Sequence, residues 1–195
     1  MGSRIMSGQA GVMQIAGKLK EIYPEAVLDI KEFAGQVSVT VDRKSVKDVL
    51  RYLVSVSDIS FDFLVALTAA DYKDKKPIRF EVVYQLHSVA HCKSLRVKAP
   101  VPEDDCTIDS VVSIWHGANW LERECFDMFG IVFKGHPDHR RILMPEDWQG
   151  HPLRKDFPLK SDLGELEWQG FKDALSAAEK NKQYEVDECH RNWGA

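Results

Sequence analysis

The spacing of apolar residues near the start of the chain predicts a helix followed by a hairpin. Apolar side chains recur at helical spacing over residues 12–22, until Pro24 ends the pattern. Two short runs follow, residues 27–30 and 37–41, and the second alternates between valine and a small polar residue. Gly35 supplies the turn between them. We therefore expect an antiparallel pair of strands directly after the first helix.

A second amphipathic helix is expected to begin at Ser45, a residue type favoured at helix N-termini. Three more apolar runs, residues 61–70, 78–86 and 93–98, are separated by polar turns and read as strands. The order of helix, two strands, helix and three strands is typical of an α+β protein. The sequence thus predicts a two-layer sandwich, in which helices cover one face of a mainly antiparallel sheet.

The pattern becomes helical again after the linker "APVPEDD". Apolar residues at helical spacing over residues 108–115 predict a short amphipathic helix that ends at Gly117. A further helix is expected to begin at Asn119 and to run to the next glycine, Gly130.

Beyond Gly130, prolines recur too often for a long helix or strand, so an extended and irregular segment is expected. It is too rich in aromatic and aliphatic residues to read as disordered. The expected division of the chain is a disordered N-terminus (1–9), an α+β body (10–130), an extended docking arm (131–160) and a charged C-terminal tail (161–195).

The composition of the chain argues against several classes of function. The formal charge of −4 gives no overall electrostatic case for binding nucleic acid or an anionic membrane. The longest nearly apolar run, residues 63–70, is far shorter than a bilayer-spanning helix. The four cysteines are too widely spaced for a zinc knuckle or an iron–sulfur ligand run, and we expect them to be reduced thiols.

Acidic side chains beside Arg123 raise the possibility of acid–base catalysis. Glu122, Glu124 and Asp127 could supply a general acid and base next to an arginine that holds a substrate. The alternative is a salt-bridged helix face, because charged runs on helices are usually solvated. Residue types alone favour the second interpretation.

Histidines in the proline-rich segment raise the possibility of a metal site. His136, His139 and His151 all lie in expected loops, and neutral imidazoles are common zinc and iron ligands. No carboxylate stands in an HExxH frame, so a stand-alone metal-dependent hydrolase is the weaker hypothesis.

The sequence also lacks the phosphate-binding glycine motifs and the GxSxG motif of serine hydrolases. What remains in the segment after residue 119 is a composition typical of interface centres, rich in tryptophan, phenylalanine, methionine and arginine. This composition favours a surface that holds another protein.

The run "ERECFDMFGIVFKGHPDHRRILMPEDWQGHPLRKDFPL" resembles the signature of the C subunit, or 30 kDa subunit, of NADH:quinone oxidoreductase, respiratory complex I. The resemblance is close over residues 119–159, and the rest of the chain agrees in length and element order. It implies a partner interface on the residues of the motif. They are Glu122, Arg123, Glu124, Asp127, His136, Arg140, Arg141, Trp148, Arg154, Lys155, Asp156 and Phe157.

The resemblance further implies a non-catalytic subunit of the peripheral arm that docks against the quinone-site subunit, the D subunit, and neighbours others such as the B and I subunits. It implies no cofactor in this chain, with flavin, iron–sulfur clusters and quinone in partner subunits. The expected location is peripheral, on the cytoplasmic side of a bacterial inner membrane or on the matrix or stromal side of an organelle. Related subunits occur in membrane-bound nickel–iron hydrogenases and in dehydrogenases with other electron donors, which leaves the donor open. His139 departs from the pattern, which commonly has leucine there.

Overall fold

The computed structural model describes residues 3–55, 59–158, 173 and 176–180. A five-stranded sheet with strand order β1-β2-β5-β4-β3 forms its centre, and a second, two-stranded sheet pairs β6 with β7. The elements in chain order are α1 (Ser3–Ile22), β1 (Val27–Phe33), β2 (Gln36–Val41), α2 (Val46–Ser55), β3 (Phe63–Asp71), β4 (Phe80–Ser88), β5 (Lys93–Val101), β6 (Thr107–Asp109), α3 (Ala118–Phe129) and β7 (Val132–Lys134).

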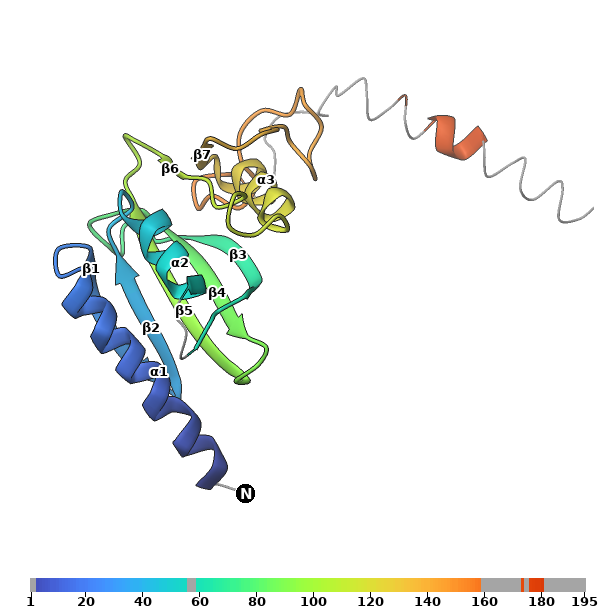
Figure 1. Cartoon of the computed structure of the whole chain (residues 1–195). Coiled ribbons are helices and arrows are strands. Elements are labelled where there is room, and N and C mark those ends of the chain that lie inside the picture. Colours follow the sequence, from blue (N-terminus) through green and yellow to red (C-terminus); the bar gives the residue numbers. More distant parts are fainter. Residues whose placement is uncertain (1–2, 56–58, 159–172, 174–175, 181–195) are drawn as a thin grey trace, which may run out of the picture. The chain divides into compact units, whose positions relative to one another are not determined.

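The fold class expected from the sequence is confirmed. Three of the strand pairs in the large sheet are antiparallel, and only β2 and β5 run parallel. Figure 1 shows α1 and α2 lying across the same face of this sheet, with α3 beside β3. Apolar residues at alternate strand positions, such as Val39, Tyr84 and Val97, are fully buried beneath the helices because successive side chains of a strand point to opposite faces.

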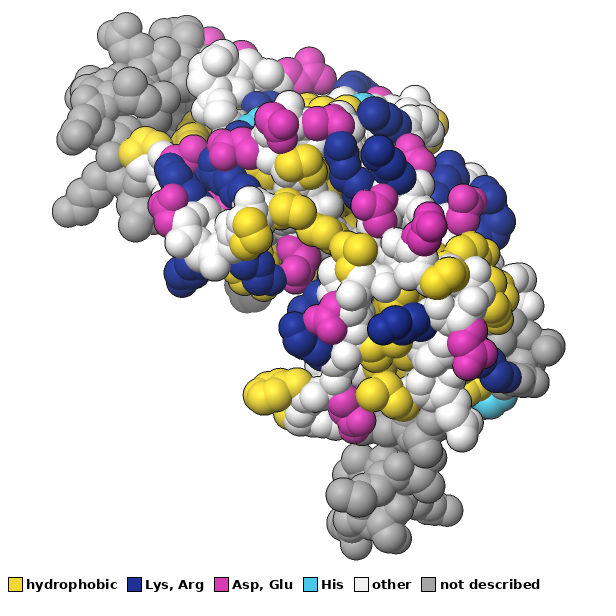
Figure 2. Space-filling view, turned by 90° about the vertical axis from the view of Figure 1, so that its left-hand side faces the viewer, with side chains coloured by type: hydrophobic (Ala, Val, Ile, Leu, Met, Phe, Trp, Pro, Cys, Tyr) yellow, Lys and Arg dark blue, Asp and Glu magenta, His cyan; other side chains and the backbone are white. Residues whose placement is uncertain are grey.

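The opposite face of the large sheet is polar. Arg96 donates hydrogen bonds to Gln85 and Gln36 across three neighbouring strands, and Lys98 lies 3.5 Å from Glu81. An antiparallel sheet with one buried face and one solvated face commonly shows this alternation. Figure 2 views the molecule from the side of α1 and β1, where acidic and basic side chains are interleaved with hydrophobic ones.

Two local expectations were wrong. Helix α1 begins at Ser3, within the segment expected to be disordered, as a continuous N-terminal extension of the helix predicted over residues 12–22. Instead of a helix over residues 108–115, the chain forms strand β6 and then a turn, in which the Ile114 and Trp115 N–H groups donate to the Val111 carbonyl. Strand pairing between β6 and β7 overrides the helical spacing, since a distant segment supplies the partner.

Two boundaries also differ. Gly117 precedes α3 as its N-cap residue instead of ending a helix. Strand β5 extends through Pro100 into the expected linker. A proline is tolerated there because the pairing of β5 with β2 stops at Lys98, so no hydrogen bond to β2 is required at Pro100.

The chain divides into two compact units, residues 1–157 and 158–195, and the second is described only at residues 158, 173 and 176–180. Residues 173 and 176–180 are helical and exposed, and the Ser176 hydroxyl donates to the Asp173 carbonyl. The rest of the expected charged tail lies outside the described residues.

Candidate subunit interface formed by α3 and the arm

Helix α3 provides the frame of the candidate site. Cys125, Met128 and Phe129 are buried against the core, while polar residues on other faces of the helix remain available. The helix ends at Gly130, whose φ of 74° is the left-handed conformation that glycine adopts at little cost. From this glycine the chain reverses into residues 131–158, which we call the arm.

Asp127 is the main attachment point of the arm. Its carboxylate accepts hydrogen bonds from the backbone N–H groups of Ile142, Leu143 and Met144, and from the Arg141 guanidinium at 2.6 Å. The side chain is fully buried. Burial alone would raise the pKa of Asp127, but the Met144 N–H and Arg141 outweigh it, so the pKa lies below its ordinary value. The site therefore holds an ionised carboxylate with several donors.

Arg123 and Arg141 tie the same stretch of arm to the helix from either side. Arg123 donates to the carbonyls of Arg140 and Arg141, both at 3.1 Å, and its guanidinium lies over the Trp120 ring. Arg141 reaches further along the arm and donates to the carbonyls of Trp148 and Gly150. These arginines act mainly as donors to backbone oxygens within the chain.

The returning half of the arm caps the C-terminal end of α3. The last carbonyls of a helix have no partner within the helix. Here His151 binds the Asp127 carbonyl, the Leu153 N–H donates to Met128, and Arg154 donates to the Phe129 carbonyl at 2.6 Å. The arm thereby satisfies three helix-end oxygens.

The end of the arm is fixed to the body through two residues that sequence reasoning missed, Asp71 and Arg79. Arg79 is 7% exposed and binds Asp71, Asp156 and Glu103, while the Lys155 N–H donates to Asp71 at 2.9 Å. Burial would raise the pKa of Asp71, but the hydrogen bonds from Arg79 and Lys155 lower it to about 2. Asp71 is the last residue of β3 and Arg79 directly precedes β4, and only folding brings these two residues close to the arm.

Glu122 behaves differently from the other acids of the motif. It is fully buried, one carboxylate oxygen accepts the Val111 N–H at 2.7 Å, and the other has no hydrogen-bond partner among the described residues. Burial raises its pKa to about 7, against the opposing effect of the Val111 N–H. His136 Nε2 lies 4.0 Å from the unpartnered oxygen.

Two histidines of the arm, His139 and His151, lie against Phe126, and the His136 ring lies beside that of His139. The His139 ring centroid is 4.2 Å from that of Phe126, and His151 lies 6.0 Å away on the same ring. Two lone pairs that a metal would need are already used, because His139 Nε2 accepts the Phe133 N–H and His136 Nδ1 accepts an N–H from the arm. Within residues 3–55 and 59–158, no group of three or more potential ligands could hold a metal ion.

The structure thus brings most of the expected interface residues together, but turns them inward. Glu122, Arg123, Asp127, His136, Arg141, Arg154 and Asp156 make contacts within the chain, and Trp148 stacks on Phe157. Glu124, Arg140, Lys155 and Asp156 are exposed, although Asp156 also pairs with Arg79.

Three exposed apolar residues on the same elements were missed. Trp120 of α3 and Leu143 of the arm are each 62% exposed, and Leu153 is 54% exposed. The sequence did not predict that these three side chains are exposed, because the path of the arm decides which residues of α3 and of the arm face solvent.

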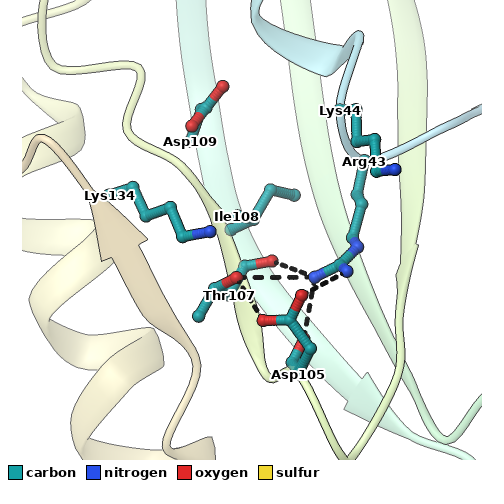
Figure 3. A pocket seen from close by; sticks show the side chains of 7 residues that line it. All are labelled: Arg43, Lys44, Asp105, Thr107, Ile108, Asp109 and Lys134. Atoms are coloured by element: carbon teal, nitrogen blue, oxygen red, sulfur yellow. Dashed lines mark hydrogen bonds and ion pairs between the residues drawn. The ribbon is translucent and has the colours of Figure 1, made fainter.

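A small pocket of about 170 Å³ lies apart from this site, where the β2–α2 turn approaches β6 and β7. Figure 3 shows Arg43 reaching Asp105 and Thr107 across it, with Lys44 and Lys134 at its sides. Arg43 holds the pKa of Asp105 at about 2. The hydrogen bonds of Arg43 join the β2–α2 turn to the start of β6 and so help to position the segment that precedes α3.

Comparison with known proteins places these features in a class, the dehydrogenase subunits of respiratory chains. Residues 39–163 match the family described as respiratory-chain NADH dehydrogenase, 30 Kd subunit. The C subunit of the NADH-quinone oxidoreductase of Geobacter metallireducens is 50% identical over 143 residues, which cover 73% of this chain and 87% of that one. The corresponding protein of Roseiflexus sp. is 46% identical over 145 residues, covering 74% and 83%.

The chain therefore belongs to the 30 kDa subunit family, the C subunits of NADH-quinone oxidoreductase. Two solved structures are similar. The trypsin-resistant fragment (1–134) of Nqo5 matches with a TM-score of 0.57 and 33% identity, covering 64% of this chain and 98% of that one. A chain of the archaeal membrane-bound sulfane sulfur reductase matches with a TM-score of 0.64 and 25% identity, covering 76% and 86%.

Membership of this family makes the other subunits of the complex its partners. The metal-dependent hydrolase and hydrogenase hypotheses are not favoured by these comparisons. In the described part of the chain, no helix has the length and apolar character needed to cross a bilayer.

Proposed function

We propose that this chain is a non-catalytic structural subunit that docks against the quinone-site subunit of the complex, using the exposed surface of α3 and the arm. The proposal rests on one observation: the large apolar side chains of Trp120, Leu143 and Leu153 are exposed and are held in place on α3 and the arm. Asp127 accepts the Leu143 N–H and the Met128 carbonyl accepts the Leu153 N–H, so both leucines are fixed against α3 with their side chains outward. Large exposed side chains on a rigid support suit an interface centre, because little conformational entropy is lost on binding.

The exposed charges Glu124, Arg140 and Lys155 would form the polar rim of this interface. The B and I subunits are the further neighbours that we propose, on the cytoplasmic side of a bacterial inner membrane or its organellar equivalent. Flavin, iron–sulfur clusters and quinone would reside in partner subunits, because this sequence has no phosphate-binding loop or cysteine ligand set.

We also propose that the body, to about Gly130, is the stable unit and that the arm completes its function. The resemblance to a trypsin-resistant fragment (1–134), matched over 98% of its length, supports this division. In this chain the arm contains exposed Arg140 and Lys155, both potential trypsin sites.

The test is recovery of the quinone-site subunit by the purified chain with Leu143→Asp and Leu153→Asp combined. We expect recovery to be lost while the thermal unfolding of the chain alone is unchanged, because both side chains are exposed. A matched control combines Phe33→Asp and Val89→Asp, which change exposed apolar residues at the end of β1 and in the β4–β5 turn. Equal recovery by both double variants would refute the assignment of this surface.

A further inference from the structure

His139 occupies an unusual position at the start of the arm. Its Nε2 atom accepts the backbone N–H of Phe133 at 3.0 Å, which is possible only for a neutral imidazole protonated on Nδ1. Phe133 lies in β7 opposite Ile108 of β6, and its side chain is buried. One imidazole therefore joins the turn after β7 to the strand itself.

The surroundings of His139 disfavour a second proton. The ring packs on Phe126 and lies 5.5 Å from the His136 ring, centroid to centroid. Burial, followed by the neighbouring His136, lowers the pKa of His139 below its ordinary value. The Nδ1 atom of His136 accepts the Asp138 N–H, and its Nε2 atom lies 3.1 Å from the Asn119 carbonyl oxygen.

The charged and titratable groups around this cluster come from both packed elements. They are Glu122, Arg123 and Asp127 from α3, and His136, Asp138, Arg140, His151 and Arg154 from the arm. Asp138 is already bound to Arg140 through two hydrogen bonds of 2.7 Å. Glu122 lies 4.0 Å from His136, and its pKa is raised.

We propose that His139 is an acid-sensitive latch, in which protonation of Nε2 displaces the Phe133 N–H, frees the turn after β7 from that strand and disturbs the packing of the His139 ring on Phe126 of α3. The added proton turns an acceptor into a donor, so two N–H groups then face each other in a partly buried space. The latch involves residues of this chain only and needs no partner subunit. An effect of the latch on docking would rest on the proposed function, whereas the hydrogen-exchange experiment tests the latch without docking.

The test is hydrogen exchange of the full chain at pH 7.5 and 5.5, corrected for the intrinsic pH dependence of exchange. The closed arm favours neutral His139, whereas His139 in the locally opened arm has a pKa near 6.5. The equilibrium constant for local opening, which we call the opening constant, therefore rises as pH falls below that value. We expect it to increase about tenfold between the two pH values for amides of residues 131–144. Nitrogen-15 NMR should show an unprotonated Nε2 on His139 at pH 7.5.

Two variants isolate the latch from the other titrating groups, among which Glu122 acts in the opposite direction. His139→Gln keeps an acceptor for the Phe133 N–H but cannot be protonated, so the increase should disappear. His139→Leu removes the acceptor and should raise opening at both pH values equally. His116→Gln, at an exposed position, is the control and should behave like the wild type. If His139→Gln keeps the same ratio of opening constants as the wild type, or if Nε2 carries a proton at pH 7.5, the proposal is wrong.

Discussion

Asp127 of α3 and Arg141 of the arm form an ion pair of 2.6 Å in which the side chains are 0% and 13% exposed. Three backbone N–H groups of the arm complete the shell of the carboxylate. A buried carboxylate with this many donors holds residues 141–144 in place, because moving them away would leave the charge without partners. The charged motif therefore determines the shape of the arm through contacts within the chain.

We expect Asp127→Asn to destabilise the arm strongly. The amide removes the negative charge and strands Arg141, and breaking a buried pair in this way costs roughly 3–5 kcal/mol. Urea unfolding and hydrogen exchange of residues 140–145 would measure the loss. Asp138→Asn breaks the exposed pair with Arg140 and should cost far less, because exposed ion pairs are screened by solvent. Similar losses in both variants would show that Asp127 is not the attachment point.

Glu122→Gln should stabilise the chain at alkaline pH. A carboxyl whose pKa is raised from 4.5 to about 7 contributes its full share of stability below pH 4.5 and loses it as pH rises through about 7. The neutral amide keeps an oxygen for the Val111 N–H and carries no charge to bury, so we expect a gain of roughly 1–3 kcal/mol at pH 8. Urea midpoints at pH 5 and pH 8 provide the measurement. A variant that is equally or less stable at pH 8 would contradict the buried, protonated carboxyl.

Gly130→Ala should displace the returning half of the arm. A Cβ there would clash with His151 Nε2 and would lie 2.6 Å from Arg154 Nη2, in addition to the strain of a φ of +74°. Gly135→Ala is the matched control, because Gly135 has a φ of +80° but no atom within 4 Å of an added Cβ. Strain alone costs roughly 1–2 kcal/mol, so the excess loss at Gly130 measures the contact with the arm. Equal melting temperatures for the two variants would show that this contact is unimportant.

Asp71→Asn should weaken the chain at neutral pH and flatten its response to acid. The pKa of Asp71 is lowered from 3.8 to about 2, so its stabilisation is present above pH 3.8 and is lost as pH falls through about 2. The wild type should lose roughly 2 kcal/mol from this residue between pH 5 and pH 2. Urea titrations across this range would show a smaller loss in the variant. An identical acid response would mean that Arg79 does not hold Asp71 ionised.

These contacts change which residues can test docking. Arg123 and Arg154 stand in the motif as charges available to a partner, yet both donate to carbonyls of their own chain. Reversing either charge would disturb the arm as well as any interface. The exposed Leu143 and Leu153 are the cleaner probes, because their side chains are free of such contacts in the body.

The sequence by itself determined the α+β class, the order of most elements and the family. Alternating valines in β2 and the helical spacing in α2 are local patterns, set by the repeat of a strand or a helix, so they can be read without knowledge of distant residues. The motif from Glu122 to Leu159 likewise carries its resemblance in residue order alone.

Only the tertiary structure decided how the arm is used. The partners of Asp156 and Lys155 are Arg79 and Asp71, which lie 77 and 84 residues away along the chain. The strand β6 replaced an expected helix because β7, beyond α3, supplied its hydrogen-bonding partner. Long-range pairs of this kind leave no local period in the sequence. A buried charge is satisfied by whatever donor the fold brings to it, and that depends on the path of the whole chain.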